Sequence, residues 1–201
     1  MTEATRLDAF PIPLYIMNIA TEMEELNKEL VKDINWIVNA QTQQRTGVGV
    51  EQTISGLEDS VESFTQLADI LSNVSSQLLG RESKAEYLWA NSTKDGFHMP
   101  HSHRIGDHMW NGVYFPYGEA DWTYESSSSP KSGSLVLLDP LEFVKSGVAD
   151  EQTDRYPHWG NPICIAPKAG TLVLFPVYLP HMVTPADGPR KSVAFYLRFK
   201  S

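Results

Sequence analysis

The sequence contains a single cysteine, Cys164, so no disulfide can form within the chain. No apolar run approaches the ~20 residues that a membrane-spanning helix needs. The first residues also lack the basic and then apolar pattern of a secretory signal. We therefore expect a soluble, cytoplasmic protein without a membrane partner.

Positive charge is also scarce, since 16 lysine and arginine residues face 25 aspartate and glutamate residues. Most of the excess negative charge lies in residues 1–80, which contain 12 acidic and 4 basic side chains. Residues 81–201 contain 13 acidic and 12 basic side chains, which nearly balance. A protein that neutralises phosphates along a nucleic acid normally carries the opposite sign. We expect no bulk nucleic acid as a partner.

The first eighty residues predict two amphipathic helices. Thr21 and Glu24 have the spacing of a capping box, and Gly80 stands where a helix end favours a left-handed residue. In each helix apolar residues recur every three or four positions, which places them on one face. The two stripes are Met23, Leu26, Leu30, Ile34 and Val38, and Phe64, Leu67, Leu71, Val74 and Leu78.

Beyond Arg81 the apolar pattern changes to the two-residue period of strands, which we expect at 87–92, 110–115, 134–138, 171–175 and 192–199. In the last run Val193, Phe195 and Leu197 alternate with Ser192, Ala194 and Tyr196, as in a strand with one buried face. Residues 141–161 read as a long insertion that could lie over a pocket.

Helices followed by antiparallel strands predict a mainly β fold with N-terminal helices. The expected architecture is a double-stranded β-helix, a jelly-roll or cupin-like barrel, buttressed by the two helices. With 41% hydrophobic residues the chain can bury one full core, so we expect one domain over 1–201. Within it, 1–80 would form the helical support and 81–201 the barrel core.

Three histidines form the candidate metal site. His101 and His103 are two residues apart, so in an extended segment they point to the same side, and His181 follows another apolar run. Three protein ligands leave positions open for a cosubstrate and dioxygen. Asp107, four residues after His103, is the alternative third ligand. Imidazole suits iron, zinc, copper and nickel alike, so the residue types alone do not choose the metal.

Arg190 and Ser192 form a candidate anion site at the start of the last predicted strand. They are two residues apart, and Arg190 follows His181 by nine residues. A guanidinium that grips a carboxylate with two parallel hydrogen bonds, helped by a hydroxyl, suits a dicarboxylic acid. His98 and His108 lie near the candidate metal site without a matching spacing. They are candidates to support the metal ligands or to face the substrate, but we favour surface positions for both.

Taken in order, these residues resemble the iron(II)/2-oxoglutarate-dependent oxygenases. Within that superfamily the chain is similar to the 2OG-Fe(II) oxygenase group of bacteria and phages, related to the prolyl 4-hydroxylases. The resemblance covers nearly the whole chain. Its main segments are Phe10 to Tyr15, Trp89 to Asn91, Gly112 to Phe115, Gly170 to Pro176, His181, and Arg190 to Ser192.

The resemblance implies that His101 and His181 are iron ligands. His103 stands where most of the superfamily has an aspartate, although this group's usual pattern also has histidine there. A neutral imidazole in place of a carboxylate leaves one more positive charge at the iron. We favour His103 over Asp107, because the strand geometry needs no special loop.

The resemblance also implies a pocket for 2-oxoglutarate. Phe115 departs from the group's pattern, which commonly has a tyrosine there, and Tyr114 would point to the opposite face of the strand. The residues expected to hold or line the cosubstrate are Arg190, Ser192, Asn91 and Asn111.

The implied activity is that of an Fe(II)/2-oxoglutarate-dependent dioxygenase. It would hydroxylate an unidentified small-molecule or peptidyl substrate with dioxygen, while 2-oxoglutarate is decarboxylated to succinate. A cupin-type metal-dependent isomerase or a cosubstrate-free dioxygenase is an alternative, although the spacing from Gly170 to His181 fits the second cupin motif poorly. A non-catalytic barrel with a structural or binding role is a second alternative. The sequence also leaves open whether the protein forms a homodimer.

Overall fold

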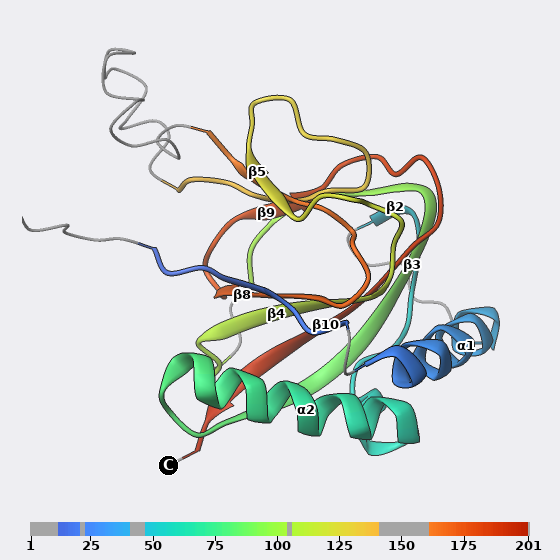
Figure 1. Ribbon diagram of the computed structural model, residues 1–201, viewed down its shortest axis with the longest axis vertical. Helices are drawn as coiled ribbons and strands as arrows, with labels where there is room; N and C mark the ends of the chain where they lie inside the picture. Colours follow the sequence, from blue (N-terminus) through green and yellow to red (C-terminus); the bar gives the residue numbers. More distant parts are fainter. Residues whose placement is uncertain (1–11, 21–22, 41–46, 104–105, 141–160, 201) are drawn as a thin grey trace, which may run out of the picture.

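The structure is a computed structural model that describes residues 12–20, 23–40, 47–103, 106–140 and 161–200. In these residues a ten-stranded antiparallel sheet curls back on itself (Figure 1). The strand order is β1-β8-β4-β10-β3-β9-β6-β7-β5, and β2 pairs with β3. The strands are β1 (Tyr15–Asn18), β2 (Gly47–Gln52), β3 (Ser83–His101), β4 (Trp110–Tyr117), β5 (Tyr124–Ser126), β6 (Leu135–Leu137), β7 (Ile163–Ile165), β8 (Thr171–Pro176), β9 (His181–Val183) and β10 (Arg190–Phe199).

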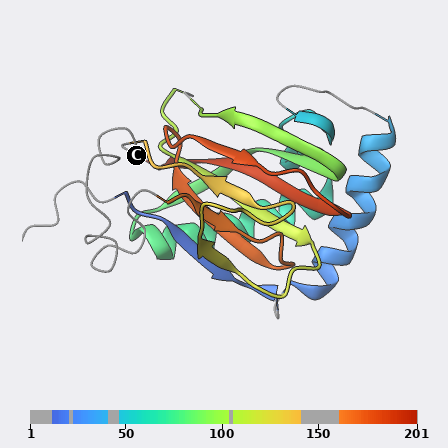
Figure 2. The same ribbon diagram turned by 90° about the horizontal axis from the view of Figure 1, so that it is seen from above.

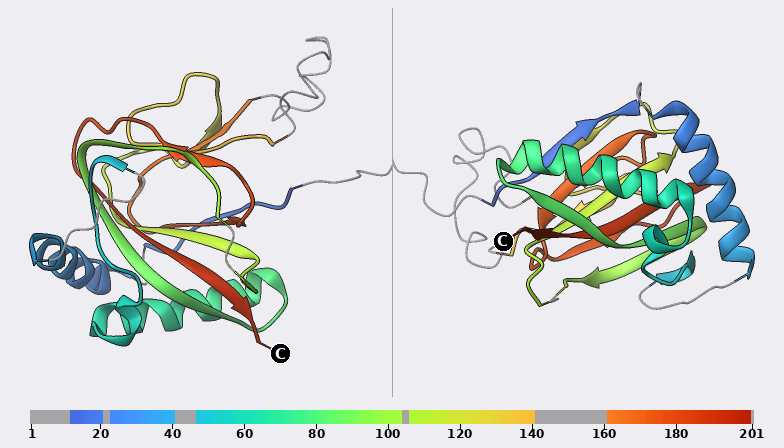
Figure 3. Two further views of the ribbon diagram at one scale, coloured as in Figure 1. Left: turned by 180° about the vertical axis from the view of Figure 1, so that it is seen from behind. Right: turned by 90° about the horizontal axis from the view of Figure 1, so that it is seen from below.

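Two α-helices, α1 (Glu24–Ala40) and α2 (Glu62–Leu79), support the sheet, and a short 3-10 helix, η2 (Leu57–Asp59), precedes α2. Both α-helices lie against the outer face of the strands around β10, as the view from below shows (Figure 3). The two predicted helices are therefore confirmed, and Gly80 ends α2 with a φ of 63°. Thr21 of the predicted capping box lies outside the described residues. No helix in the described part of the chain is long and apolar enough to span a membrane.

The apolar side chains form two cores, one on each face of the sheet. The first lies between the helices and the sheet and contains the predicted stripes with Tyr114, Val193, Phe195 and Leu197. The second lies inside the curl of the sheet and contains Phe115. Tyr114 and Phe115 thus point to opposite faces of β4, as the sequence predicts. In the view from above, the helices lie behind and beside the strands (Figure 2).

Strand β3 is much longer than the predicted run 87–92, since it continues to His101. Its second half contains Lys94, Asp95 and Gly96, which carry no strand signal. Pairing with β2 holds this half in the sheet, and Gly96 lies so close to β2 that an added Cβ would come within 2.3 Å of the Gly49 carbonyl oxygen. Tertiary contact therefore overrides local propensity here.

Two strands from the first eighty residues, β1 and β2, also join the sheet, beside β8 and β3 respectively. Neither was expected, and nor were the short strands β5, β7 and β9. The predicted insertion at 141–161 lies outside the described residues, apart from its last residue.

Candidate metal centre and cavity

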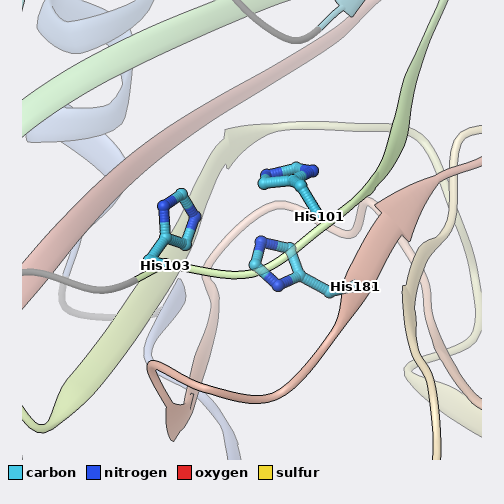
Figure 4. Close-up of side chains that lie close together, drawn as sticks. All are labelled: His101, His103 and His181. Atoms are coloured by element: carbon cyan, nitrogen blue, oxygen red, sulfur yellow. The ribbon is translucent and has the colours of Figure 1, made fainter.

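The structure brings the three candidate imidazoles together inside the curl of the sheet (Figure 4). His101 ends β3 and pairs in register with His181 at the start of β9, while His103 follows β3 by two residues. The ring centroids are 4.4 to 5.1 Å apart. One ring nitrogen of each lies within 4.8 Å of the others. This arrangement can hold one metal ion.

Hydrogen bonds orient the three rings. His101 Nδ1 lies 2.7 Å from the Met99 carbonyl oxygen, and His181 Nδ1 lies 2.9 Å from the Leu179 carbonyl oxygen. Because a carbonyl can only accept, each Nδ1 carries the hydrogen and each Nε2 keeps a free lone pair. His103 Nδ1 lies 3.0 Å from the hydroxyl of Tyr196. Such bonds to the non-ligating nitrogen are typical of metal-binding histidines.

Burial keeps the imidazoles of His103 and His181 neutral. The pKa of His181 falls to about 3, first through burial and also through the nearby His101, His103 and His98. The pKa of His103 falls to about 4, first through burial and then through the nearby His101. A metal can bind only an unprotonated imidazole nitrogen, so these two rings can bind one at neutral pH.

Asp107, the alternative third ligand, is exposed and does not belong to the converging group. His103 supplies the third nitrogen in the geometry described, and its backbone N–H is fixed by a 3.0 Å bond to the Val177 carbonyl. Among the described residues, the arrangement therefore brings His103, and not Asp107, together with His101 and His181.

The three histidines and Arg190 line one cavity of about 330 Å³. Arg190 is only 3% exposed, and its Nε has no hydrogen-bond partner. Within the described residues no carboxylate lies within ion-pair distance of this guanidinium, which stands 5.1 Å from the centre of the Phe115 ring. Burial lowers the pKa of Arg190 to about 10, so it stays charged at neutral pH. A buried cation without a counter-charge indicates an anion site.

Other buried polar groups around the cavity also lack hydrogen-bond partners in the described part of the chain. Thr93 lies opposite Arg190 in the pairing of β3 with β10, and Asn91 lies opposite Ser192. Asn91, Asn111 and Ser192 line the cavity. Buried polar atoms are nearly always hydrogen-bonded, yet among the described residues several here have no partner in the protein, namely Asn91 Oδ1, Asn111 Oδ1 and Thr93 Oγ1. These atoms suit a polar ligand or the waters around it.

The surface positions expected for His98 and His108 are wrong. His98 is 7% exposed and lines the cavity, where burial, the charge of Arg190 and His101 together lower its pKa to about 4. An irregularity in the pairing of β3 with β9 lies between His98 and His101, so strand periodicity could not place His98 on the same side. His108 is buried beside Glu86, with its Nε2 3.3 Å from the carboxylate.

Aromatic side chains line the cavity beyond the histidines, and no local sequence pattern predicts them as a group. Tyr87, Trp89 and Tyr196 all contribute to the lining. The register between β3 and β10 shifts at this point, and Tyr87 takes a left-handed φ of 57°. The carboxylate of Glu58 accepts the N–H groups of Tyr87 and Leu88 at 2.6 and 2.8 Å, which fixes the bulge.

The sequence matches a family model described as "Putative 2OG-Fe(II) oxygenase" over residues 87–196, more than half of the chain. This stretch includes all three clustered histidines, Arg190 and Ser192. No curated protein matches the sequence.

Solved structures of 2-oxoglutarate oxygenases share the fold. A prolyl-4-hydroxylase from Pseudomonas putida superposes with a TM-score of 0.61 at 18% identity, covering 94% of each chain. HygX from Streptomyces hygroscopicus, with nickel and 2-oxoglutarate bound, superposes with a TM-score of 0.63 at 12% identity. The match covers 93% of this chain and 83% of the other. A Trichoplax adhaerens prolyl hydroxylase in complex with a peptide fragment superposes with a TM-score of 0.62 at 14% identity. The match covers 92% of this chain and 83% of the other. The predicted fold class is therefore confirmed.

Proposed function

Because the chain belongs to the 2OG-Fe(II) oxygenase family, we propose that it hydroxylates a substrate C–H bond while 2-oxoglutarate is oxidatively decarboxylated. The substrate, dioxygen and 2-oxoglutarate would give the hydroxylated product, succinate and carbon dioxide. The observation that carries this proposal is Arg190, a buried cation that shares one cavity with three converging histidines.

The cavity has the right chemistry for the family's cofactors, Fe(II) and 2-oxoglutarate. His101, His103 and His181 would hold the iron through neutral nitrogens. Arg190 would receive the distal carboxylate of 2-oxoglutarate, with Ser192 beside it on the same face of β10. Iron with its cosubstrate supplies the oxidising chemistry. The protein binds, orients and shields the reactants.

His98 lines the same cavity as Arg190 and the three clustered histidines, and its ring centroid lies 6.2 Å from that of His101. A neutral imidazole there can hydrogen-bond to the cosubstrate without adding charge. We assign His98 to the cosubstrate side of the cavity.

The aromatic end of the cavity, away from Arg190, would take the substrate. Tyr87 is 48% exposed, as expected for a residue at the mouth. Trp89 and Tyr196 stand close to His103, with ring centroids 6.3 and 5.5 Å away, so a bound molecule there would lie next to the metal. Small molecules and peptidyl residues both fit this description.

The direct test is spectroscopic. Anaerobic addition of Fe(II) and 2-oxoglutarate to the purified protein should produce a visible charge-transfer band, and Arg190→Ala should weaken cosubstrate binding while metal binding is retained. Arg198→Ala is the matched control, because Arg198 lies on the same strand but is exposed and paired with Glu86. A protein that gives neither the band nor succinate, with or without candidate substrates such as peptidyl proline, would refute the proposal.

The third ligand needs its own test. We expect His103→Ala to lose most iron binding and Asp107→Ala to keep it. The reverse result would make Asp107 the ligand. An isomerase, a cosubstrate-free dioxygenase or a silent barrel would instead be indicated by metal binding that 2-oxoglutarate does not affect.

A further inference from the structure

Tyr196 occupies a position that the family assignment does not explain. It lies on the cavity face of β10 with Arg190, Ser192 and Ala194, and it is only 6% exposed. Its hydroxyl lies 3.0 Å from Nδ1 of His103. The two residues are 93 positions apart, so the fold alone brings them together.

His103 differs from the other two histidines in how its ring is held. The rings of His101 and His181 are each bonded to a carbonyl two residues earlier in their own segment. A carbonyl can only accept, so these two rings have a fixed tautomer. The ring of His103 is bonded instead to a hydroxyl, which can donate or accept.

The direction of this bond decides whether His103 can bind a metal. If the hydroxyl donates to Nδ1, the hydrogen of the neutral ring sits on Nε2 and that nitrogen has no free lone pair. If Nδ1–H donates to the hydroxyl oxygen, Nε2 is free to face the other two histidines. A bound metal selects the second arrangement, and the hydroxyl then holds the ring in place.

The surroundings of Tyr196 restrict its movement. Its ring packs against Trp89, with centroids 5.2 Å apart, and against His108, with centroids 5.7 Å apart. Glu86 binds His108 on one carboxylate oxygen and Arg198 on the other, at 3.3 and 2.7 Å. The hydroxyl of Tyr196 is therefore presented to His103 from a rigid wall.

We infer that Tyr196 is a positioning residue that allows a histidine to serve as the third ligand where most of the superfamily has an aspartate. The inference rests on the metal site of the proposed function. An aspartate has no second ring nitrogen that must be bonded, whereas an imidazole needs its tautomer and its ring plane fixed. The hydrogen bond to Tyr196 holds the ring plane, and the hydroxyl oxygen accepts from Nδ1–H in the tautomer that leaves Nε2 free for the metal.

The test is a double-mutant cycle of metal affinity on the metal-free protein, with Co(II) titrated calorimetrically. Tyr196→Phe should weaken Co(II) binding about 10-fold or more, the usual range for removing such a bond. In a His103→Ala background the same change should have less than about a twofold effect, because its partner is gone. The visible spectrum of the Co(II) complex should also change in Tyr196→Phe.

Tyr114→Phe is the matched control. Tyr114 is also buried, but its hydroxyl donates to Asn27 on the helix side of the sheet, 2.7 Å away. Its loss should leave Co(II) affinity unchanged. The thermal midpoints of the metal-free variants show whether Tyr196→Phe keeps the fold. We expect it to do so, because phenylalanine keeps the aromatic ring and loses only the hydroxyl.

Three outcomes separate the claims. Unchanged Co(II) affinity in Tyr196→Phe, or an equal loss with and without His103, would overturn the positioning role while the oxygenase site stands. Wild-type protein that binds no metal would overturn the site and the positioning role together. Normal metal binding without any effect of 2-oxoglutarate would refute the proposed function and leave the role of Tyr196 intact.

Discussion

The two faces of strand β10 are equally buried but chemically opposite. Towards the helices it presents Val193, Phe195 and Leu197, each at most 1% exposed and part of the first apolar core. Towards the cavity it presents Arg190 and Tyr196, at 3% and 6% exposure. Burial alone therefore does not distinguish a residue that stabilises the fold from one that serves the site.

The number of buried polar atoms without a partner differs between the two sides. On the helix side Tyr114 is bonded to Asn27 and Ser63 to Asp33, although Ser75 Oγ of α2 has no partner in the described part of the chain. Around the cavity several such atoms lie together, and each costs about 1–3 kcal/mol. A ligand that bonded to them would offset this cost.

The largest effect should come from removing the centre of the helix-side core. Phe195→Ala should lower the free energy of unfolding by about 3–5 kcal/mol, since the ring is fully buried and covers Gly112. Ser192→Ala, three residues earlier on the cavity face, should change it by less than about 1 kcal/mol. Urea unfolding of the metal-free proteins measures both changes. Similar losses of unfolding free energy in the two variants would contradict the claim that the two faces of β10 differ in their contribution to stability.

The buried histidines should make the free energy of unfolding fall as the pH is lowered. The pKa values of His98 and His181 are lowered to about 4 and about 3, whereas an unfolded chain takes up protons near 6.5. Between those values the unfolded state binds more protons, so the metal-free protein should lose stability as the pH falls below 6.5. Each histidine adds at most about 1.4 kcal/mol per pH unit.

His98→Gln provides the comparison for that profile. The variant should show a shallower fall in unfolding free energy between pH 6.5 and 5, where most carboxylates are still ionised. Urea midpoints across this range test it. Parallel curves for the variant and the wild type would mean that His98 titrates normally.

The smallest effect concerns the bulge at the cavity mouth. Tyr87 has a φ of 57°, a conformation that costs a residue with a Cβ about 1–2 kcal/mol. Tyr87→Gly should therefore be more stable than Tyr87→Ala by about 1 kcal/mol, the reverse of the usual order in strands. Thermal unfolding of the pair decides it, and a more stable alanine variant would show that the strain is absent.

The sequence predicts the helix-side core well, because amphipathic stripes and strand alternation depend on local spacing. Both helical stripes and the alternation of β10 are found as expected. Local sequence patterns do not predict the features that depend on pairing between distant segments. Strand β3 beyond residue 92, the position of His98 and the bond between Tyr196 and His103 all follow from bulges and contacts between distant segments.

The candidate site was predictable only as a set of residue types. The spacing of the histidines and of Arg190 with Ser192 named residues that the fold does bring to one cavity. Only the three-dimensional arrangement separates His103 from Asp107, because the sequence places both within a few residues of His101, and the identity of the third ligand stays a prediction. The hydrogen bonds that fix each ring were not visible in any local pattern.

The central claim is that Arg190 holds the distal carboxylate of 2-oxoglutarate. Calorimetric binding of 2-oxoglutarate and of 2-oxopentanoate, which has a methyl group in place of that carboxylate, to anaerobic Fe(II)-loaded protein tests it most directly. The wild type should prefer 2-oxoglutarate about 100-fold, as expected for a buried charge pair. Arg190→Met should lose that preference. Equal affinities in the wild type, or a preference that survives in Arg190→Met, would contradict the account.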